Sequence, residues 1–443
     1  MKGKFFLLIG ILCLLLAVFA TRSAQAQTFQ TLYTFTGISP DGADPWNDLL
    51  LDLNGTLYGT TSVGGVYGCG TVYKLNSKGE ETVLYSFTGG ADGCFPQSNV
   101  LQDRHGNLYG VALFGGNLTA ANCIDDGGCG VVYKLDTKGN ETVLYTFTGG
   151  TDGNIPQGLT MDLADNLYGI TLSGGNLSYS NTPPGAGVVY KLDTRSHFTV
   201  LYTFTGGADG AVPNDYLTLG WAGNIYGVTV FGGNPAYCSG SGCGTVFKLD
   251  TRGKLTTLHT FTGTDGSEPE GPLVLDVWGN LYGTTYEGGD LTCNSGSGCG
   301  VVYKLTTAGK YSVLHTFTGT SDGAQPPMGL IGDLLDNLYG VTEWGGTGNC
   351  SSWSATTATP APPPGCGVVF KLDARSHFTV LYTFTGLADG AAPGSAPIMD
   401  WQGNLYGNTV YGGDFSCSSW DGSYSTTGCG VVYKLAPGWQ DQR

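Results

Sequence analysis

The sequence predicts an all-β fold, a seven-bladed β-propeller built from four-stranded antiparallel blades. Three short phrases, each repeated seven times in the same order, lead to this prediction: Leu-Tyr-Gly (once Ile-Tyr-Gly), Gly-(Thr/Val)-Val-(Tyr/Phe)-Lys-Leu and Leu-(Tyr/His)-(Thr/Ser)-Phe-Thr-Gly. Their residue types favour strands, and an apolar segment such as 49–52 supplies a fourth strand before each Leu-Tyr-Gly. Four strands per unit, at a period of 51 to 67 residues, are typical of propeller blades.

The phase of the repeat predicts how the ring closes. The first phrase, at 32–36, is a fourth strand without the three that should precede it. The last phrase, at 430–435, is a third strand without a fourth. Pairing these two segments would complete the seventh blade and remove two exposed sheet edges. We therefore expect one closed domain over residues 27–443.

Residues 1–26 have the pattern of a signal peptide. Lys2 and Lys4 precede an apolar run at 5–20, and the small residues Ala24 and Ala26 predict cleavage after Ala26. The run is short for a membrane span, and no later segment matches it, so we expect no span in the mature chain. The C-terminus carries no visible anchor. These features predict secretion, to the periplasm or the medium.

The charge balance is strongly acidic. The formal net charge is −16, and it becomes −19 without residues 1–26, which carry three basic side chains and no acidic one. Such a charge disfavours nucleic acids and anionic membrane surfaces as partners. It favours a soluble protein, which we expect to be a monomer, and it is compatible with cation binding.

The order of the phrases resembles a known family. Asp-Gly-x-x-Pro, Gly-Asn-Leu-Tyr-Gly, Gly-Gly, Gly-Val-Val-Tyr-Lys-Leu and Val-Leu-Tyr-Thr-Phe follow one another as in the Gloeobacter/Verrucomicrobia-type (GloVer) tandem repeat, over essentially the whole mature chain. The resemblance implies a bacterial exported protein of a kind often attached to the cell surface. It implies no established activity and no catalytic residue.

Cysteine spacing predicts six disulfides. Twelve of the thirteen cysteines follow residue 26, and an even number is typical of exported disulfide-bonded proteins. Five pairs fall within single long loops: Cys123/Cys129, Cys238/Cys243, Cys293/Cys299, Cys350/Cys366 and Cys417/Cys429. The two remaining cysteines, Cys69 and Cys94, lie in neighbouring segments and form the sixth predicted pair. Metal ligation is the alternative, but the tight clusters it needs are absent from these spacings, so we predict no metal site here.

One face of the propeller should carry the sequence variety. In an up-and-down blade, the loop between the second and third strands lies on the same face as the connection to the next blade. Long irregular loops occur only there, at 117–128, 176–186, 234–242, 290–298, 347–365 and 414–428. Variable loops on a rigid scaffold usually hold the binding site, so we place a candidate site on this face.

Aromatic and acidic residues on this face are candidate ligand contacts. The residue before each Gly-Gly pair varies between repeats, and Trp46, Trp353 and Trp420 lie in connecting segments. The predicted ligand-binding residues are Trp46, Phe114, Phe231, Glu287, Trp344 and Tyr411. Exposed rings would stack on sugars or form a patch for a protein partner. Alternatively, these side chains fill gaps beneath the loops.

Seven Asp-Gly-x-x-Pro segments offer a second kind of candidate. Their aspartates could face the central cavity and hold Ca²⁺, or they could close Asx-type turns. The sevenfold repetition favours turns, because a functional site is usually asymmetric. We therefore predict no cofactor, with Ca²⁺ as the alternative. The aspartates are Asp41, Asp92, Asp152, Asp209, Asp265, Asp322 and Asp389.

These observations favour an extracellular binding module for a carbohydrate or a cell-surface protein. The alternatives are a polysaccharide-degrading enzyme, either a glycosidase or a lyase, and a purely structural surface protein. An enzyme would need paired acids, for which only the scattered residues Asp44, Glu268, Glu270, Glu287 and Glu343 are available. No Gly-x-Ser-x-Gly phrase or dinucleotide fingerprint is present, so catalytic residues are not predicted.

Overall fold

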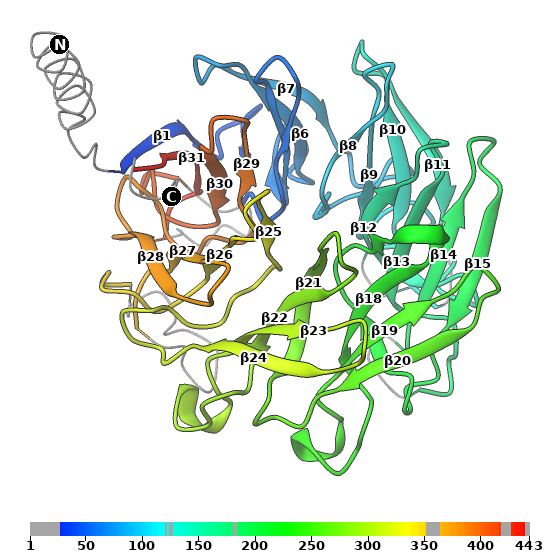
Figure 1. Cartoon of the computed structure of the whole chain (residues 1–443). Helices are drawn as coiled ribbons and strands as arrows, with labels where there is room; N and C mark the ends of the chain where they lie inside the picture. Colours follow the sequence, from blue (N-terminus) through cyan, green and yellow to red (C-terminus); the bar gives the residue numbers. More distant parts are fainter. Residues whose placement is uncertain are drawn as a thin grey trace, which may run out of the picture.

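The protein is a ring of seven antiparallel blades, which confirms the predicted seven-bladed propeller (Figure 1). The computed structural model describes residues 27–119, 122–123, 127–179, 184–350, 364–417 and 427–438. Besides strands, these residues form three short 3-10 turns: η1 (Trp221–Gly223), η2 (Cys238–Gly240) and η3 (Asn294–Gly296). No helix among them is long and apolar enough to cross a membrane.

Each blade runs from an inner strand beside the central channel to an outer strand at the rim. Blade 1 is β3 (Leu50–Leu51), β4 (Leu57–Thr61), β6 (Thr71–Leu75) and β7 (Glu81–Ser86). Blade 2 is β8 (Leu101–Gln102), β9 (Leu108–Ala112), β10 (Val131–Leu135) and β11 (Glu141–Thr146). Blade 3 is β12 (Asn154–Met161), β13 (Leu167–Ser173), β14 (Val188–Leu192) and β15 (Phe198–Thr203). In blade 4 the inner strand is divided into β16 (Ala211–Pro213) and β17 (Thr218–Leu219), followed by β18 (Ile225–Phe231), β19 (Thr245–Leu249) and β20 (Leu255–Thr260).

The remaining blades repeat this order. Blade 5 is β21 (Ser267–Leu275), β22 (Leu281–Glu287), β23 (Val301–Leu305) and β24 (Tyr311–Thr316), and blade 6 is β25 (Ile331–Gly332), β26 (Leu338–Thr342), β27 (Val368–Leu372) and β28 (Phe378–Thr383). Blade 7 is β29 (Ile398–Met399), β30 (Leu405–Thr409), β31 (Val431–Ala436) and β1 (Thr28–Thr34). A small extra sheet joins β2 (Gly42–Ala43) to β5 (Val63–Gly64).

The two ends of the chain close the ring, as predicted. β1 pairs antiparallel with β31, from Thr28 opposite Ala436 to Thr34 opposite Val431 (Figure 1). The first strand of the folded chain is therefore the outer strand of the last blade. This pairing covers edges that an open array would leave exposed.

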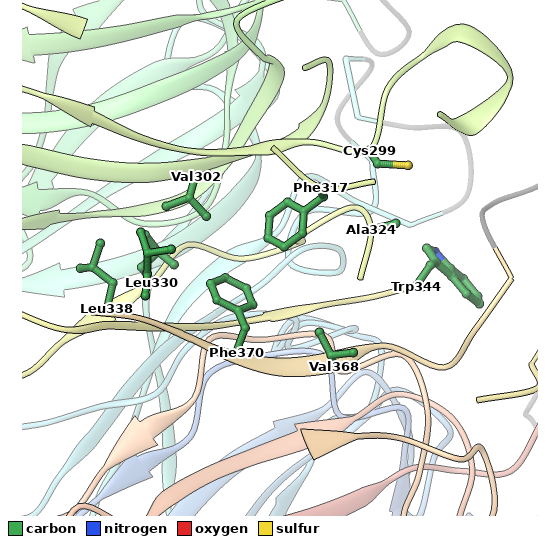
Figure 2. Close-up of a cluster of buried hydrophobic side chains, with 10 residues drawn as sticks. Cys299, Val302, Phe317, Ala324, Leu330, Leu338, Trp344, Val368 and Phe370 are labelled. Atoms are coloured by element: carbon green, nitrogen blue, oxygen red, sulfur yellow. The ribbon is translucent and has the colours of Figure 1, made fainter. Parts of the chain in front are cut away.

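The core lies between neighbouring blades and explains the repeated phrases. Tyr133 of β10 is fully buried, and its ring meets Phe87 of blade 1 edge to face at 5.0 Å between centroids. A side chain on Gly110, the glycine of Leu-Tyr-Gly, would place its Cβ 2.3 Å from the hydroxyl of Tyr133. Figure 2 shows the same arrangement two blades before the closure, where Phe317 of blade 5 packs towards Leu330 and Phe370 of blade 6.

The Asp-Gly-x-x-Pro aspartates hold the end of an outer strand and do not form a ring facing the channel. Asp92 accepts hydrogen bonds from the Thr88 N–H at 2.8 Å and from the Tyr85 hydroxyl at 3.0 Å. Equivalent contacts recur in the other repeats, with His259 and His315 replacing the tyrosine in two of them. These contacts agree with the turn interpretation.

The residue before each of these prolines locks one blade to the next. It has a left-handed backbone in all seven repeats, with φ between 52° and 57°: Asp44, Phe95, Ile155, Val212, Glu268, Gln325 and Ala392. That conformation turns its N–H towards the preceding blade, as where Phe95 donates to the carbonyl of Cys69 at 3.0 Å. A strained conformation repeated in this way persists because the surrounding structure determines it.

Candidate functional site

The structure separates the connections between strands into two faces. We define the loop face as the connections between blades together with the loops that join the second and third strands of each blade. The two sets lie together, since β2 pairs with β5 and Cys94 bridges to Phe114. We call short-turn face the turns that join the first to the second strand and the third to the fourth.

All six predicted disulfides are present, and every one lies on the loop face. They are Cys69–Cys94, Cys123–Cys129, Cys238–Cys243, Cys293–Cys299, Cys350–Cys366 and Cys417–Cys429. Cys69–Cys94 ties a blade 1 loop to the connection that leads into blade 2, while the others close single loops. Six disulfides indicate an oxidising, extracellular kind of environment.

Charge is divided unequally between the faces. The described part of the loop face contains sixteen Asp and Glu residues and no Lys or Arg. All fifteen described Lys and Arg residues lie on third strands or short turns. A surface with carboxylates of one sign creates a negative potential that attracts cations and repels anions.

Nine of the sixteen loop-face acids are not motif aspartates, and six of these nine gather at the mouth of the central channel. We call these six the channel acids: Asp48, Asp215, Glu268, Glu270, Glu287 and Glu343. The Tyr216 hydroxyl donates to a carboxylate oxygen of Asp48 at 2.5 Å, although 168 residues separate them. Because Asp48 precedes the inner strand of blade 1 and Tyr216 lies between the two parts of the inner strand of blade 4, this contact spans the channel.

A second contact joins blades 5 and 6 at the same mouth. The Tyr286 hydroxyl donates to a carboxylate oxygen of Glu343 at 2.8 Å. Glu343 is buried, and its backbone N–H donates to the carbonyl of Gln325. Glu270 lies close enough to Glu268, Glu343 and Asp215 for their negative charges to act on it.

Burial and mutual repulsion raise the pKa of these carboxyls. Burial, with the charge of Glu287, raises the pKa of Glu268 to about 7, and burial raises the pKa of Glu343 to about 7. Burial also raises the pKa of Asp48 to about 6, although its bond from Tyr216 acts in the opposite direction. For Asp215 and Glu270, burial and neighbouring carboxylates hold the pKa well above the usual range.

Polar atoms without partners lie among the channel acids. Asp215 is 8% exposed and Gln325 is 4% exposed, yet one oxygen of each accepts no hydrogen bond. One oxygen of Asp48 is also without a partner. A buried acceptor without a donor costs free energy, so these atoms favour an incoming donor such as an ammonium group.

Sequence comparison places this repeat among known ones. The model of the Gloeobacter/Verrucomicrobia repeat matches residues 17–183, 126–354 and 176–420. The chain belongs to this family. No curated protein matches it.

Solved structures of several enzymes are similar to this family member, one of them at a TM-score above 0.5. Virginiamycin B lyase from Staphylococcus aureus, solved with quinupristin, is 13% identical with a TM-score of 0.55, and the match covers 93% of this chain and 99% of the lyase. A luciferin-regenerating enzyme is 13% identical with a TM-score of 0.42, covering 93% and 96% of the two chains. A gluconolactonase from Xanthomonas campestris is 14% identical with a TM-score of 0.40, covering 71% and 86%. At these identities the likeness concerns the fold alone.

In this GloVer-family chain, the six residues predicted to bind ligand come from six different blades. Glu287 is a channel acid, and Tyr411 lies near Glu343 and Asp44, whose charges together with burial raise the pKa of Tyr411 to about 12. Trp46 lies against Gly394, where an added Cβ would come 3.1 Å from the indole ring. These three residues are at or beside the channel mouth.

The other three predicted residues pack against the core and the connections between blades. Trp344 is only 8% exposed and belongs to the core cluster with Cys299 and Ala324 (Figure 2). Phe114 meets Phe95 edge to face at 5.6 Å. Phe231 packs against the core of blades 3 and 4. Trp353 and Trp420 lie outside the described residues.

Sequence reasoning missed Asp48, Asp215, Tyr216 and Tyr286 of the channel mouth. The signal was available, because the residues directly after the repeated proline differ between all blades and are acidic or aromatic in blades 1, 4 and 5. Among the described residues, no group of three His, Cys, Asp or Glu side chains is arranged to hold a metal ion. The expectation of no cofactor, with calcium as the alternative, stays a prediction.

Proposed function

We propose that this protein is an exported binding module whose loop face holds a positively charged carbohydrate at the channel mouth. The observation that carries the proposal is the charge division: sixteen carboxylates and no Lys or Arg on the described loop face. An amino sugar supplies both features that the mouth favours. Its ammonium groups would donate to the unpartnered oxygens of Asp215 and Gln325, and its rings would lie against Tyr411 and Trp46.

Protonation would couple to this binding. The raised pKa values of Glu268 and Glu343, about 7 each, keep these carboxyls partly protonated near neutral pH. A bound ammonium favours the carboxylate form, so binding should release protons from the carboxyls and strengthen as pH rises above 6, up to the pH at which the amino groups of the sugar lose their own protons. Salt should weaken it, because the attraction is electrostatic.

Titration calorimetry with glucosamine oligomers and with N-acetylglucosamine oligomers of equal length tests the proposal. The two ligands share ring and linkage and differ in charge, so only the first should bind. The Glu270→Gln/Glu343→Gln double variant should weaken binding at least about tenfold. The Asp290→Asn/Asp414→Asn variant is the control, since it removes two loop-face charges outside the channel mouth.

Three outcomes would reject the proposal. Equal affinity for charged and acetylated oligomers would reject a charge-based site. Equal weakening in the control variant would place binding elsewhere on the face. Binding of oligolysine without binding of glucosamine oligomers would identify a basic protein segment as the ligand in place of a carbohydrate.

Carbohydrate cleavage is a second candidate, favoured by one observation. Glycoside hydrolysis uses a protonated carboxyl beside an ionised one, and Glu270, whose pKa is held well above its usual range, would be the protonated member of a pair with Glu343, whose pKa is about 7. New reducing ends after incubation with polysaccharides, lost in the Glu343→Gln variant, would support cleavage. An unchanged rate in that variant would exclude Glu343 from the catalytic pair.

A further inference from the structure

The short-turn face presents a ring of apolar side chains to solvent. Six of the seven turns between first and second strands have large apolar residues at their tips, each 60% to 106% exposed: Leu53, Leu163, Trp221, Val277, Trp278, Leu334, Leu335 and Trp401. The exception is blade 2, whose tip holds Arg104, paired with Asp165 at 2.7 Å. Soluble monomers rarely expose this much apolar surface around one axis.

The turn geometry does not require apolar tips. In blade 6, Asp333 accepts hydrogen bonds from the N–H groups of Leu335 and Asn337 at 2.8 and 2.9 Å. The turn between third and fourth strands in blade 2 has the same bonds, from Lys138 and Asn140 to Asp136 at 2.8 and 2.9 Å. There the tip is polar, and five of the six turns of that kind have Lys or Arg at the tip. The apolar tips are therefore a property of the inner ring of turns and not of the turn type.

Three of these tips surround one apolar hollow. Leu163, Trp221 and Val277, from blades 3, 4 and 5, line a depression of 770 Å³, whose wall also includes Leu219 and Leu275. The tips are held by hydrogen-bonded turns, so their exposure does not come from loose chain. They form a fixed apolar surface at this end of the channel.

We propose that this ring docks on a phospholipid bilayer, with the turn tips inserted among the lipid headgroups. Trp and Leu on rigid projections suit this interface, because Trp is enriched at the level of the headgroups and Leu at the acyl boundary. The Lys and Arg residues of the outer turns surround the ring, and their long side chains can reach lipid phosphates.

The difference in charge between the faces favours one orientation, because the short turns carry eight Lys and Arg residues beside thirteen Asp and Glu residues, whereas the described loop face has no Lys or Arg. The loop face, with its sixteen carboxylates, points away from the bilayer when the short-turn face is against it. Gln27, the first described residue, lines a hollow on the short-turn face with Leu335 and Met399. The folded part of the chain therefore begins on the side of the proposed contact.

A bilayer fits this surface better than a second copy of the chain. Side chains exposed as fully as Leu53, Leu163 and Leu334 project beyond their neighbours. Two such rings meeting face to face would touch at their tips and leave gaps between them. A layer of headgroups can close around each tip separately.

Flotation with POPC vesicles tests this inference on the mature chain. We expect the protein to float with the vesicles, with a blue shift of its tryptophan fluorescence. The Leu53→Asp/Leu163→Asp/Leu334→Asp variant should lose at least about tenfold in vesicle affinity. The Leu118→Asp/Leu177→Asp/Leu291→Asp variant is the matched control, because it places the same three charges on exposed leucines of the loop face and should bind as the unchanged protein does.

Circular dichroism and urea unfolding of both variants show whether the fold is kept, and the Trp221→Ala/Trp401→Ala variant offers a second test without added charge. Absence of vesicle binding by the unchanged protein would overturn the proposal, as would equal loss in the loop-face control. A concentration-dependent dimer that the turn variant abolishes, without vesicle binding, would show that a second copy covers this face.

Discussion

The two faces of the propeller come from the same seven repeats but differ in loop length, disulfide content, charge and exposed apolar side chains. On the loop face, length varies, disulfides close the loops and the charges are all negative in the described residues. On the short-turn face, the turns are uniform, no disulfide is present among the described residues and large apolar side chains stand in solvent. The repeat therefore fixes the sheet, while each face is free to acquire its own chemistry.

The largest difference should appear when a glycine on each face is replaced. Gly130 of the loop face has φ +89°, and an added Cβ would lie 2.5 Å from the Ala112 carbonyl and from Pro156 of the next blade. Gly55 of a short turn has φ +81° and open space around it. We expect Gly130→Ala to lower the free energy of unfolding by at least about 4 kcal/mol and Gly55→Ala by about 1 kcal/mol. Urea unfolding measures both, and equal losses would contradict the packing argument.

Disulfide removal should have the next largest effect. Cys69–Cys94 closes 25 residues and links blade 1 to the connection into blade 2, while Cys238–Cys243 closes five. Loop-closure entropy gives a loss of about 3 to 4 kcal/mol for the double serine variant of the first pair and about 2 kcal/mol for the second. Thermal unfolding under oxidising conditions tests the order. A larger loss for the short loop would show that strain or packing, not chain entropy, dominates.

Neutralising a channel acid should stabilise the protein, in a pH-dependent way. The pKa of Glu343 is about 7 when folded and near 4.5 when unfolded, so between these values the folded state holds more protons. Folding stability of the unchanged protein therefore falls as pH rises from about 4.5 to 7. Glu343→Gln, which can still accept the Tyr286 hydroxyl, should gain about 1 to 3 kcal/mol at pH 8 and almost nothing at pH 4. A gain independent of pH would contradict this assignment.

The smallest effect should come from the apolar turn tips. Leu334 is fully exposed, so Leu334→Ser removes no packing and should change the free energy of unfolding by less than about 0.5 kcal/mol. A loss above 1 kcal/mol in urea unfolding would show that the tip contributes to the fold. In that case the contribution of Leu334 to the fold would explain why an apolar residue is present there, and no docking partner would be needed to explain its exposed side chain.

Much of the architecture could be predicted because each repeat carries the same local instructions. Strand types, turn residues and the displaced phase at 32–36 predicted the blades and the closure of β1 on β31. The pairing of Cys69 with Cys94 was also predictable, because the loops that contain them had already been assigned to one face. Trp344 illustrates the limit, since its position before Gly-Gly allowed either an exposed ligand contact or a gap filler beneath the loops, and only the structure shows that it enters the core beside Cys299.

By itself, the sequence determined the propeller, its closure and its six disulfides, because a periodic local pattern can be recognised without knowing which distant segments meet in the folded chain. Only the tertiary structure brought Asp48 to Tyr216 across the channel, and only it showed that the channel acids share one mouth. The reason is physical: the pKa values of those acids depend on burial and on each other's charges, and both arise when seven distant segments meet at one axis. The same closure separates the acidic face from the apolar ring, which no single repeat contains.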